Sequence, residues 1–268
     1  MEPATRTAAH SDGFFALMLP FGLIFTLSAS PALAGGCAFE PQGEGRVAAV
    51  IDARSFRLAD GREIRLAGIE PAVSTTTGRA RTAALSAIIA GHDVTLHGQD
   101  DAPDRYGRQV AFVFLGSSEN LVQGLLLSQG EVLVSADVTD KDCAAALVAA
   151  EAEARQAKRG TWADASVIKS AESPDDILTG IGRFTVVEGK VLSVRQAGAT
   201  TYLNFGRNWT QDFAATISRR MTPAIEAAGL TIKSLENKRI RVRGFVEARG
   251  GPRIEVLRAG QIEVLGVN

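Results

Sequence analysis

The chain has 268 residues, of which 46% are hydrophobic, and 29 Lys and Arg against 30 Asp and Glu give a formal net charge of −1. This length supports a full hydrophobic core in one or two domains, and the absence of heptads and biased tracts excludes a coiled coil or a low-complexity protein. The charge is unevenly distributed, because residues 180–268 carry about twice as many basic as acidic residues while residues 35–179 are acidic. A basic half is typical of a chain that binds a polyanion or an acidic partner, and equally of an ordinary solvated surface.

The N-terminal stretch 1–34 has the pattern of a secretory signal. Arg6 and His10 precede an apolar run that ends in small residues, and Ala32-Leu33-Ala34 forms an A-x-A cleavage site. Cleavage after Ala34 predicts an exported protein, periplasmic or secreted. A membrane anchor and a lipoprotein lipidated at Cys37 are the alternatives.

The two cysteines, Cys37 and Cys143, are expected to be paired. An exported chain folds in an oxidising compartment, where two cysteines favour a disulfide over free thiols. Neither has a neighbouring Cys or His at metal-ligand spacing, so a metal site is not predicted for them. The bond would tie the start of the mature chain to a helix that begins near Asp140.

Residues 44–73 read as a meander of three short strands. Apolar residues recur mostly at every second position, and Asp60-Gly61 lies between two such runs, which is the strongest short-range hairpin signal. Further along the chain the periodicity changes between two and 3.6 residues, which predicts alternating strands and helices. The expected elements are a helix at 78–90, strands at 92–97 and 109–115, a helix from 120 to Gly130, and a helix from 140 to 159.

The order of residues in this region resembles the staphylococcal-type thermonuclease family. The runs Val50-Ile51-Asp52-Ala53-Arg54-Ser55 and Arg65-Leu66-Ala67-Gly68-Ile69-Glu70 correspond to the family's V-I-D-G-D-T and R-L-x-G-I-D, and Asp104-Arg105-Tyr106-Gly107-Arg108 reproduces D-[KR]-Y-G-R. The resemblance implies a five-stranded Greek-key barrel of the OB class over residues 35–163.

The resemblance also implies which residues would carry chemistry. Arg65 and Arg108 match the two phosphate-binding arginines, and Glu70 matches a ligand Asp of the family's Ca²⁺ site. Arg54, however, stands where the second ligand Asp belongs, and Val73 takes the place of the catalytic Glu. A cation in a ligand position repels Ca²⁺, and a valine cannot accept a proton from water. The sequence therefore keeps the phosphate-binding cations and loses a metal ligand and the general base.

After a polar interval at 164–182, predicted to be a linker, the strand pattern restarts. Strands are expected at 186–194, 201–205, 212–218, 239–247 and 253–257, with a helix at 223–228, and they predict a second OB-like barrel over residues 183–268. The fold class is thus mainly β with helices, as two tandem OB-fold-like five-stranded barrels.

A basic and aromatic face is expected on this second domain. Alternation places the arginines of Arg239-Ile240-Arg241-Val242-Arg243 on one side of a strand, and OB barrels bind single strands with cations and exposed rings. The predicted nucleic-acid-binding residues are Tyr202, Arg207, Trp209, Arg239, Arg241, Arg243 and Arg253.

The sequence predicts an exported thermonuclease-like protein with a degenerate site, which binds single-stranded nucleic acid or another polyanion. One alternative is an active phosphodiesterase with a rearranged site that uses Arg65, Arg108 and Glu70. The other is an envelope scaffold that binds proteins. No cofactor is expected, and Ca²⁺ would be required only by the nuclease alternative.

Overall fold

The computed structural model describes residues 1, 37, 39–72, 78–98, 102–116, 118, 120–135 and 137–266. The predicted signal sequence therefore lies, apart from Met1, outside the described residues, as does Val73. None of the helices in the described parts is long and apolar enough to cross a membrane. Residues Ala32–Asn268 form one compact unit.

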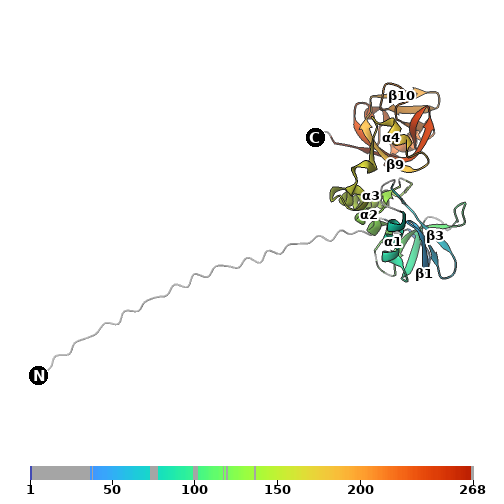
Figure 1. Ribbon diagram of the computed structural model, residues 1–268, viewed down its shortest axis with the longest axis vertical. Coiled ribbons are helices and arrows are strands. Elements are labelled where there is room, and N and C mark those ends of the chain that lie inside the picture. The colour runs from blue at the N-terminus through green and yellow to red at the C-terminus, as the bar shows by residue number, and fades with distance from the viewer. Residues whose placement is uncertain are drawn as a thin grey trace. The chain divides into compact units, whose positions relative to one another are not determined.

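The first sheet closes into a barrel, in the order β1-β2-β3-β6-β5, with β1 returning to β5 (Figure 1). Closure depends on the length of β1, because its first half pairs with β5 and its second half pairs with β2. The predicted five-stranded OB-like barrel is confirmed. Its strands are β1 (Glu40–Asp52), β2 (Ser55–Leu58), β3 (Glu63–Leu66), β5 (Asp93–Gly98) and β6 (Gln109–Leu115).

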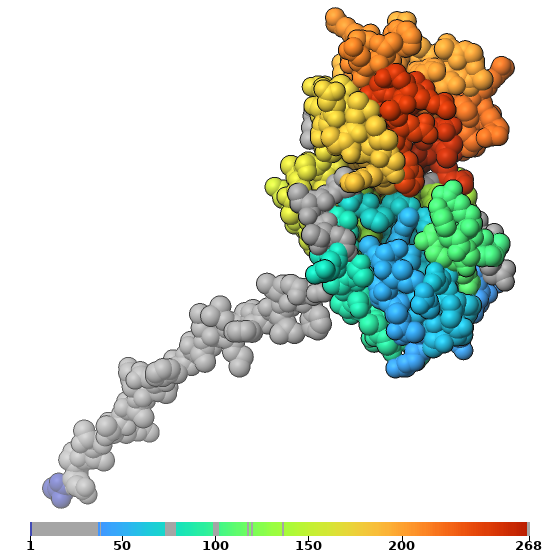
Figure 2. Space-filling view, turned by 45° about the vertical axis from the view of Figure 1, so that its right-hand side comes forward, coloured from blue at the N-terminus to red at the C-terminus, as the bar shows by residue number. Residues whose placement is uncertain are grey.

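Three helices and a two-stranded sheet complete this region. Leu85 and Ile89 of the first helix are fully buried, and on the face shown in Figure 2 the blue and cyan segments of the barrel form a continuous surface. Asp140 caps the third helix by accepting a hydrogen bond from the backbone N–H of Cys143, as its position predicts. The elements are α1 (Gly78–Ile89), α2 (Val122–Gln129), α3 (Lys141–Gln156), β4 (Ile69–Glu70) and β7 (Leu133–Val134).

Cys37 and Cys143 form the predicted disulfide. Their Cα atoms are 4.4 Å apart, and both residues are fully buried in the core of the first barrel. The bond joins the segment that precedes β1 to the first turn of α3.

The second sheet is not closed and runs β10-β11-β12-β14-β13-β9-β8, with β15 paired to β13. Val191 and Leu192 separate β9 from β10. If β9 and β10 are counted as one strand, the order is that of the first barrel. The prediction of a second closed barrel of five strands is wrong, because the sheet is open and β8 and β15 add to it by pairing with β9 and β13. The strands are β8 (Ile168–Ser170), β9 (Phe184–Lys190), β10 (Ser193–Ala197), β11 (Thr200–Asn204), β12 (Ala214–Ser218), β13 (Arg239–Arg249), β14 (Gly251–Val256) and β15 (Ile262–Val264).

The interval 164–182, expected as a linker, contains β8 and the helix α4 (Pro174–Leu178). Ile177 of α4 is fully buried in the core of the second sheet, which also receives Ile225 from α5 (Thr222–Ala227). Short 3-10 turns occur at η1 (Gly160–Ala163), η2 (Ala165–Val167), η3 (Ile232–Leu235) and η4 (Ala259–Gln261). The domain limits 35–163 and 183–268 stay predictions.

A small apolar cluster connects β7, α3 and η1 with the second sheet. Trp162 from η1 and Leu133 from β7 pack in it with Phe184 and Val186 from β9. The sequence predicts that Trp162 packs back after the third helix, and its ring is buried.

Candidate functional site

Glu70 lies at the centre of the family-matched site. It stands at the end of β4, directly after a turn in which Gly68 has a φ of +75°. A side chain at position 68 would also bring its Cβ within 2.9 Å of Leu147, so glycine is required there. The turn places a carboxylate that is only 6% exposed against the barrel strands.

Two arginines share this carboxylate. Nη2 of Arg65, on β3, donates to Oε1 of Glu70 at 3.0 Å, and Nη1 of Arg54 forms an ion pair with the same oxygen. Arg54 is held between β1 and β2, where its backbone N–H donates to Oδ1 of Asp52. The guanidinium that replaces a family metal ligand therefore neutralises the remaining carboxylate.

The pairing on Glu70 leaves Nε of Arg65 buried and without a hydrogen-bond partner in the described part of the chain. The side chain of Arg65 as a whole remains 20% exposed.

Arg108, the other family-matched arginine, is paired within its own loop. Its Nε and Nη2 donate to Oδ2 of Asp104 at 3.0 and 2.8 Å. Burial alone raises the pKa of the Asp104 carboxyl, but the hydrogen bonds from Arg108 and from the backbone N–H groups of Arg108 and Tyr106 outweigh it and lower the pKa to about 2. Arg108 precedes β6, whose Gln109 lies opposite Ile64 of β3, so the loop is adjacent to the strand that carries Arg65.

The ring of Tyr106 is the exposed part of this loop. It is 65% exposed and lies 4.8 Å from the guanidinium carbon of Arg105 and 5.1 Å from that of Arg108. The structure thus brings Arg65 and Glu70 into direct contact and holds Arg108 on a separate carboxylate.

The residues present do not fit the Ca²⁺ ion that the family resemblance implies. Ca²⁺ takes six to eight oxygen ligands, several of them carboxylates. Glu70 is already bound by two guanidinium groups, and Oδ1 of Asp52 accepts a backbone N–H. Within the described ranges, no group of three or more His, Cys, Asp and Glu side chains is placed to hold a metal ion.

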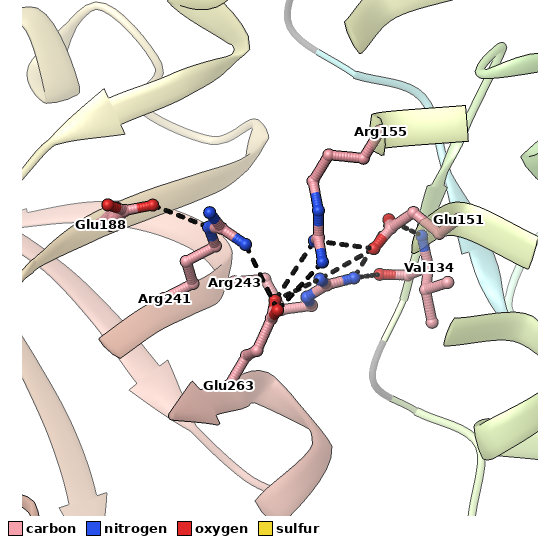
Figure 3. A network of polar contacts seen from close by, with 7 residues as sticks. All are labelled: Val134, Glu151, Arg155, Glu188, Arg241, Arg243 and Glu263. Atoms are coloured by element: carbon pink, nitrogen blue, oxygen red, sulfur yellow. Dashed lines mark hydrogen bonds and ion pairs between the residues drawn. The ribbon is translucent and has the colours of Figure 1, made fainter. Parts of the chain in front are cut away.

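The predicted arginine row of β13 is engaged by carboxylates (Figure 3). Arg239 and Arg241 donate through Nε to the two oxygens of Glu188, each at 2.7 Å. Figure 3 draws the bond from Arg241. Burial alone raises the pKa of the Glu188 carboxyl, but the hydrogen bonds from Arg239 and Arg241 outweigh it and lower the pKa. Arg241 also donates to Glu263 at 3.2 Å. The charges of Arg239 and Arg241 are therefore paired with carboxylates on neighbouring strands.

The expectation that all three arginines of the row form one exposed basic face is wrong for Arg243. Its side chain is 4% exposed, and it donates to both oxygens of Glu151 at 3.1 and 2.9 Å and to the carbonyl oxygen of Val134. Glu151 projects from α3, so the pair joins the two domains, and Arg155 of the same helix binds Glu263 of β15 (Figure 3). Arg243 faces a helix that sequence alternation cannot reveal.

The other four predicted residues lie together. Tyr202, Arg207, Trp209 and Arg253 line one cleft of about 680 Å³ on the second domain. Arg195 lines it as well and was missed by sequence reasoning, although it is directly opposite Tyr202 in the β10–β11 hairpin. The sequence signal for Arg195 was its position before the Ala197-Gly198-Ala199 turn, because pairing of the two strands in a hairpin places it beside Tyr202.

Comparisons with known proteins match a nuclease family and two relatives. The family model described as Staphylococcal nuclease homologue matches residues 63–164, which include Arg65, Glu70 and Arg108. Two curated relatives, from Escherichia coli O157:H7 and Escherichia coli, are both named "Uncharacterized endonuclease". Each is 31% identical over 128 residues, which cover 46% of this chain and 80% of the relative.

Proposed function

This chain belongs to the staphylococcal nuclease homologue family, as its motifs predict, and from that premise we propose that it binds single-stranded nucleic acid or another polyanion without hydrolysing it. We also propose that it does so as an exported, catalytically degenerate member. The ion pairing of Arg54 and Arg65 with the single carboxylate of Glu70 carries the proposal.

This pairing removes the carboxylate from metal chemistry. Ca²⁺ would have to displace two guanidinium groups from Glu70 and would gain one carboxylate in return, where the family motif supplies two. Arg54 would remain as a positive charge beside the ion, which further lowers the affinity for a cation. Hydrolysis that depends on Ca²⁺ is therefore not expected.

The general base is missing as well. Val73, which matches the family's catalytic Glu, lies outside the described residues, and no valine atom accepts a proton wherever it is placed. The loss of general-base catalysis typically costs about 10²–10⁴-fold in rate. Loss of the base adds to the loss of the metal site.

Binding can persist without hydrolysis because the cations remain. Arg65 keeps a side chain that is 20% exposed, and the second domain carries Arg195, Arg207 and Arg253, which form no ion pair within 4.0 Å in its described residues. Arginine binds phosphate through two parallel N–H groups, which requires no metal. Affinity that arises in this way decreases steeply with salt.

Export is supported by the disulfide. Buried, bonded cysteines such as Cys37 and Cys143 are typical of proteins that fold outside the reducing cytosol. Cleavage after Ala34 would leave Cys37 as the third residue of the mature chain. Mass spectrometry of the protein from the periplasmic or secreted fraction tests this, and an intact N-terminus in that fraction would contradict it.

The decisive experiment is a nuclease assay on single- and double-stranded DNA and on RNA, with and without Ca²⁺. We expect no cleavage at a thermonuclease-like rate in either condition. Robust Ca²⁺-dependent cleavage that Arg108→Ala abolishes would overturn the proposal and establish the alternative of a phosphodiesterase with a rearranged site. Binding of neither nucleic acid nor any polyanion would favour the protein scaffold.

A restored variant supplies the complementary test. Arg54→Asp, Glu70→Asp and Val73→Glu together would return the two ligand carboxylates and the base, and we expect Ca²⁺-dependent cleavage to appear. The matched control carries Arg57→Asp in place of Arg54→Asp. Arg57 is exposed on β2 and pairs with Glu63, so the control changes the charge equally but leaves the cation on Glu70.

A further inference from the structure

The cleft of about 680 Å³ on the second domain combines cations with two aromatic rings, the exposed Trp209 and the partly buried Tyr202. We propose that this cleft, and not the family-matched site on the first domain, is the primary binding site for single-stranded nucleic acid. Bases stack on Trp209 and Tyr202, while Arg195, Arg207 and Arg253 hold the phosphates. The inference rests on the proposed function and names its ligand and its site.

The arginines of the cleft differ from the others in this domain. Among the described residues, Arg195, Arg207 and Arg253 take part in none of the ion pairs within 4.0 Å, whereas Arg239, Arg241 and Arg243 all do. Arg195 and Arg207 are exposed to solvent. Arg253 donates to the carbonyl oxygen of Arg249, which orients it without neutralising it. Arg195 interacts electrostatically with the Glu236 carboxylate without forming an ion pair with it. The three side chains therefore keep positive charge that can attract phosphates.

Trp209 is held in an exposed position by its loop. Its side chain is 77% exposed, although an indole is ordinarily buried at least in part. The loop between β11 and β12 is closed by hydrogen bonds on both sides of the ring: Asn208 N–H donates to Asp212, Asp212 N–H donates back to the Asn208 carbonyl, and Thr210 Oγ donates to Asn208. The backbone of the loop is therefore held in place at Trp209, which lowers the conformational entropy lost when a base stacks there.

The cations flank the second ring. Tyr202 on β11 is opposite Arg195 on β10, and the guanidinium carbon of Arg253 lies 5.3 Å from the tyrosine ring centroid. Arg253 can reach this ring because the residue opposite it on the intervening strand β12 is Ala214, whose side chain is small. A single-stranded nucleic acid that lies across β10, β11 and β12 would therefore contact arginine and aromatic side chains in alternation.

The aromatic rings of the cleft determine which kind of polyanion it binds. A polyanion without bases would gain from the arginines but not from Trp209. Stacking of a base on an aromatic side chain contributes about 1–3 kcal/mol and requires an unpaired base. β11 and β12 correspond to the second and third strands of an OB fold, whose outer face binds oligonucleotides.

The protein contains two tryptophans, of which only Trp209 is exposed; Trp162 is buried. Titration of the full mature chain with single-stranded oligothymidylate should therefore quench the exposed tryptophan fluorescence. Anisotropy of a labelled strand gives the affinity of the variants. We expect Trp209→Ala to weaken binding roughly 5- to 150-fold, and Arg207→Gln to lower the salt slope by about 0.7.

Arg220→Gln is the matched control, because Arg220 is exposed on the same domain and does not line the cleft. Affinity and salt slope should stay unchanged in this variant. The buried Trp162 reports whether each variant is folded. Weakened binding in Trp209→Ala and Arg207→Gln but not in Arg220→Gln would support the inference.

Three results would overturn it. If the strand binds with unchanged affinity in Trp209→Ala and Arg207→Gln, the proposed function survives and the binding site lies elsewhere. If heparin or polyphosphate binds as tightly as the strand and Trp209→Ala has no effect on either, the ligand is a polyanion without bases. If no nucleic acid or polyanion binds but an acidic peptide does, the proposed function fails together with the inference.

Discussion

Arg243 and Glu151 form the buried ion pair that connects the two domains, and replacing Arg243 by Met should destabilise the whole protein. Both side chains are almost fully buried, at 4% and 1% exposure. Arg243→Met removes both hydrogen bonds to the Glu151 carboxylate and leaves its charge inside the protein. The remaining contacts of that carboxylate are the Val134 N–H at 2.8 Å and Nη1 of Arg155 at 3.9 Å.

The expected loss follows from this geometry. Removing one partner of a buried ion pair typically costs about 3–5 kcal/mol, because the other charge stays desolvated. The remaining hydrogen bond from Val134 and the distant Arg155 place Arg243→Met toward the lower end of that range. For a chain of this size the melting temperature should decrease by roughly 6–20 °C. Glu151→Gln should lose a similar amount, because it leaves the Arg243 cation unpaired.

The double variant Glu151→Gln, Arg243→Met tests the reasoning. It removes both charges, while the amide oxygen introduced by Glu151→Gln can still accept the Val134 N–H, so we expect it to be more stable than either single variant. Urea unfolding with the disulfide intact gives all four free energies, and the cycle gives the coupling. If the double variant loses the sum of the two single losses, or if Arg243→Met loses less than about 1 kcal/mol, the pair is not the connection described here.

Three other sites have measurable consequences. Glu70→Gln should destabilise the first domain by about 1–3 kcal/mol, because Arg54 and Arg65 lose their shared carboxylate. The control, Glu63→Gln on the exposed side of β3, should change the free energy of unfolding by less than about 0.5 kcal/mol, as measured by urea unfolding of both variants. Replacing both cysteines by serine should cost about 2–4 kcal/mol, since the bond closes a separation of 106 residues, and an unchanged unfolding midpoint would contradict this. The pKa of Asp104 is about 2, below the ordinary 3.8. The contribution of its carboxylate to stability is therefore fully present above pH 3.8 and is lost as the pH decreases through about 2. An NMR titration of the Asp104 carboxyl carbon with a midpoint near 4 would refute the pairing with Arg108.

Local sequence patterns were sufficient for much of the fold. The strand at 109–115 has the predicted limits, Asp60-Gly61 forms the turn between β2 and β3, and Asp140 caps α3. These features depend on side-chain alternation, on the backbone freedom of glycine and on one capping side chain. All of them act between residues close in sequence.

Long-range patterns were harder to predict. Ile177 makes the interval 164–182 part of the second core, although its neighbours are polar. The second sheet is open, although the strand pattern continues across Val191 and Leu192. Both outcomes depend on which segment pairs with which, and alternation along one strand contains no information about its neighbour.

The same division holds for the candidate sites. The sequence by itself determined that Arg54 and Val73 stand where the family motif has carboxylates, and it predicted that Tyr202 and Trp209 accompany arginines. Only the tertiary structure decided that Arg54 and Arg65 share Glu70, and that Arg243 is buried against Glu151, 92 residues away. The charge of an arginine is a property of the residue, but whether that charge is free depends on the carboxylates that the fold brings within about 4 Å of it.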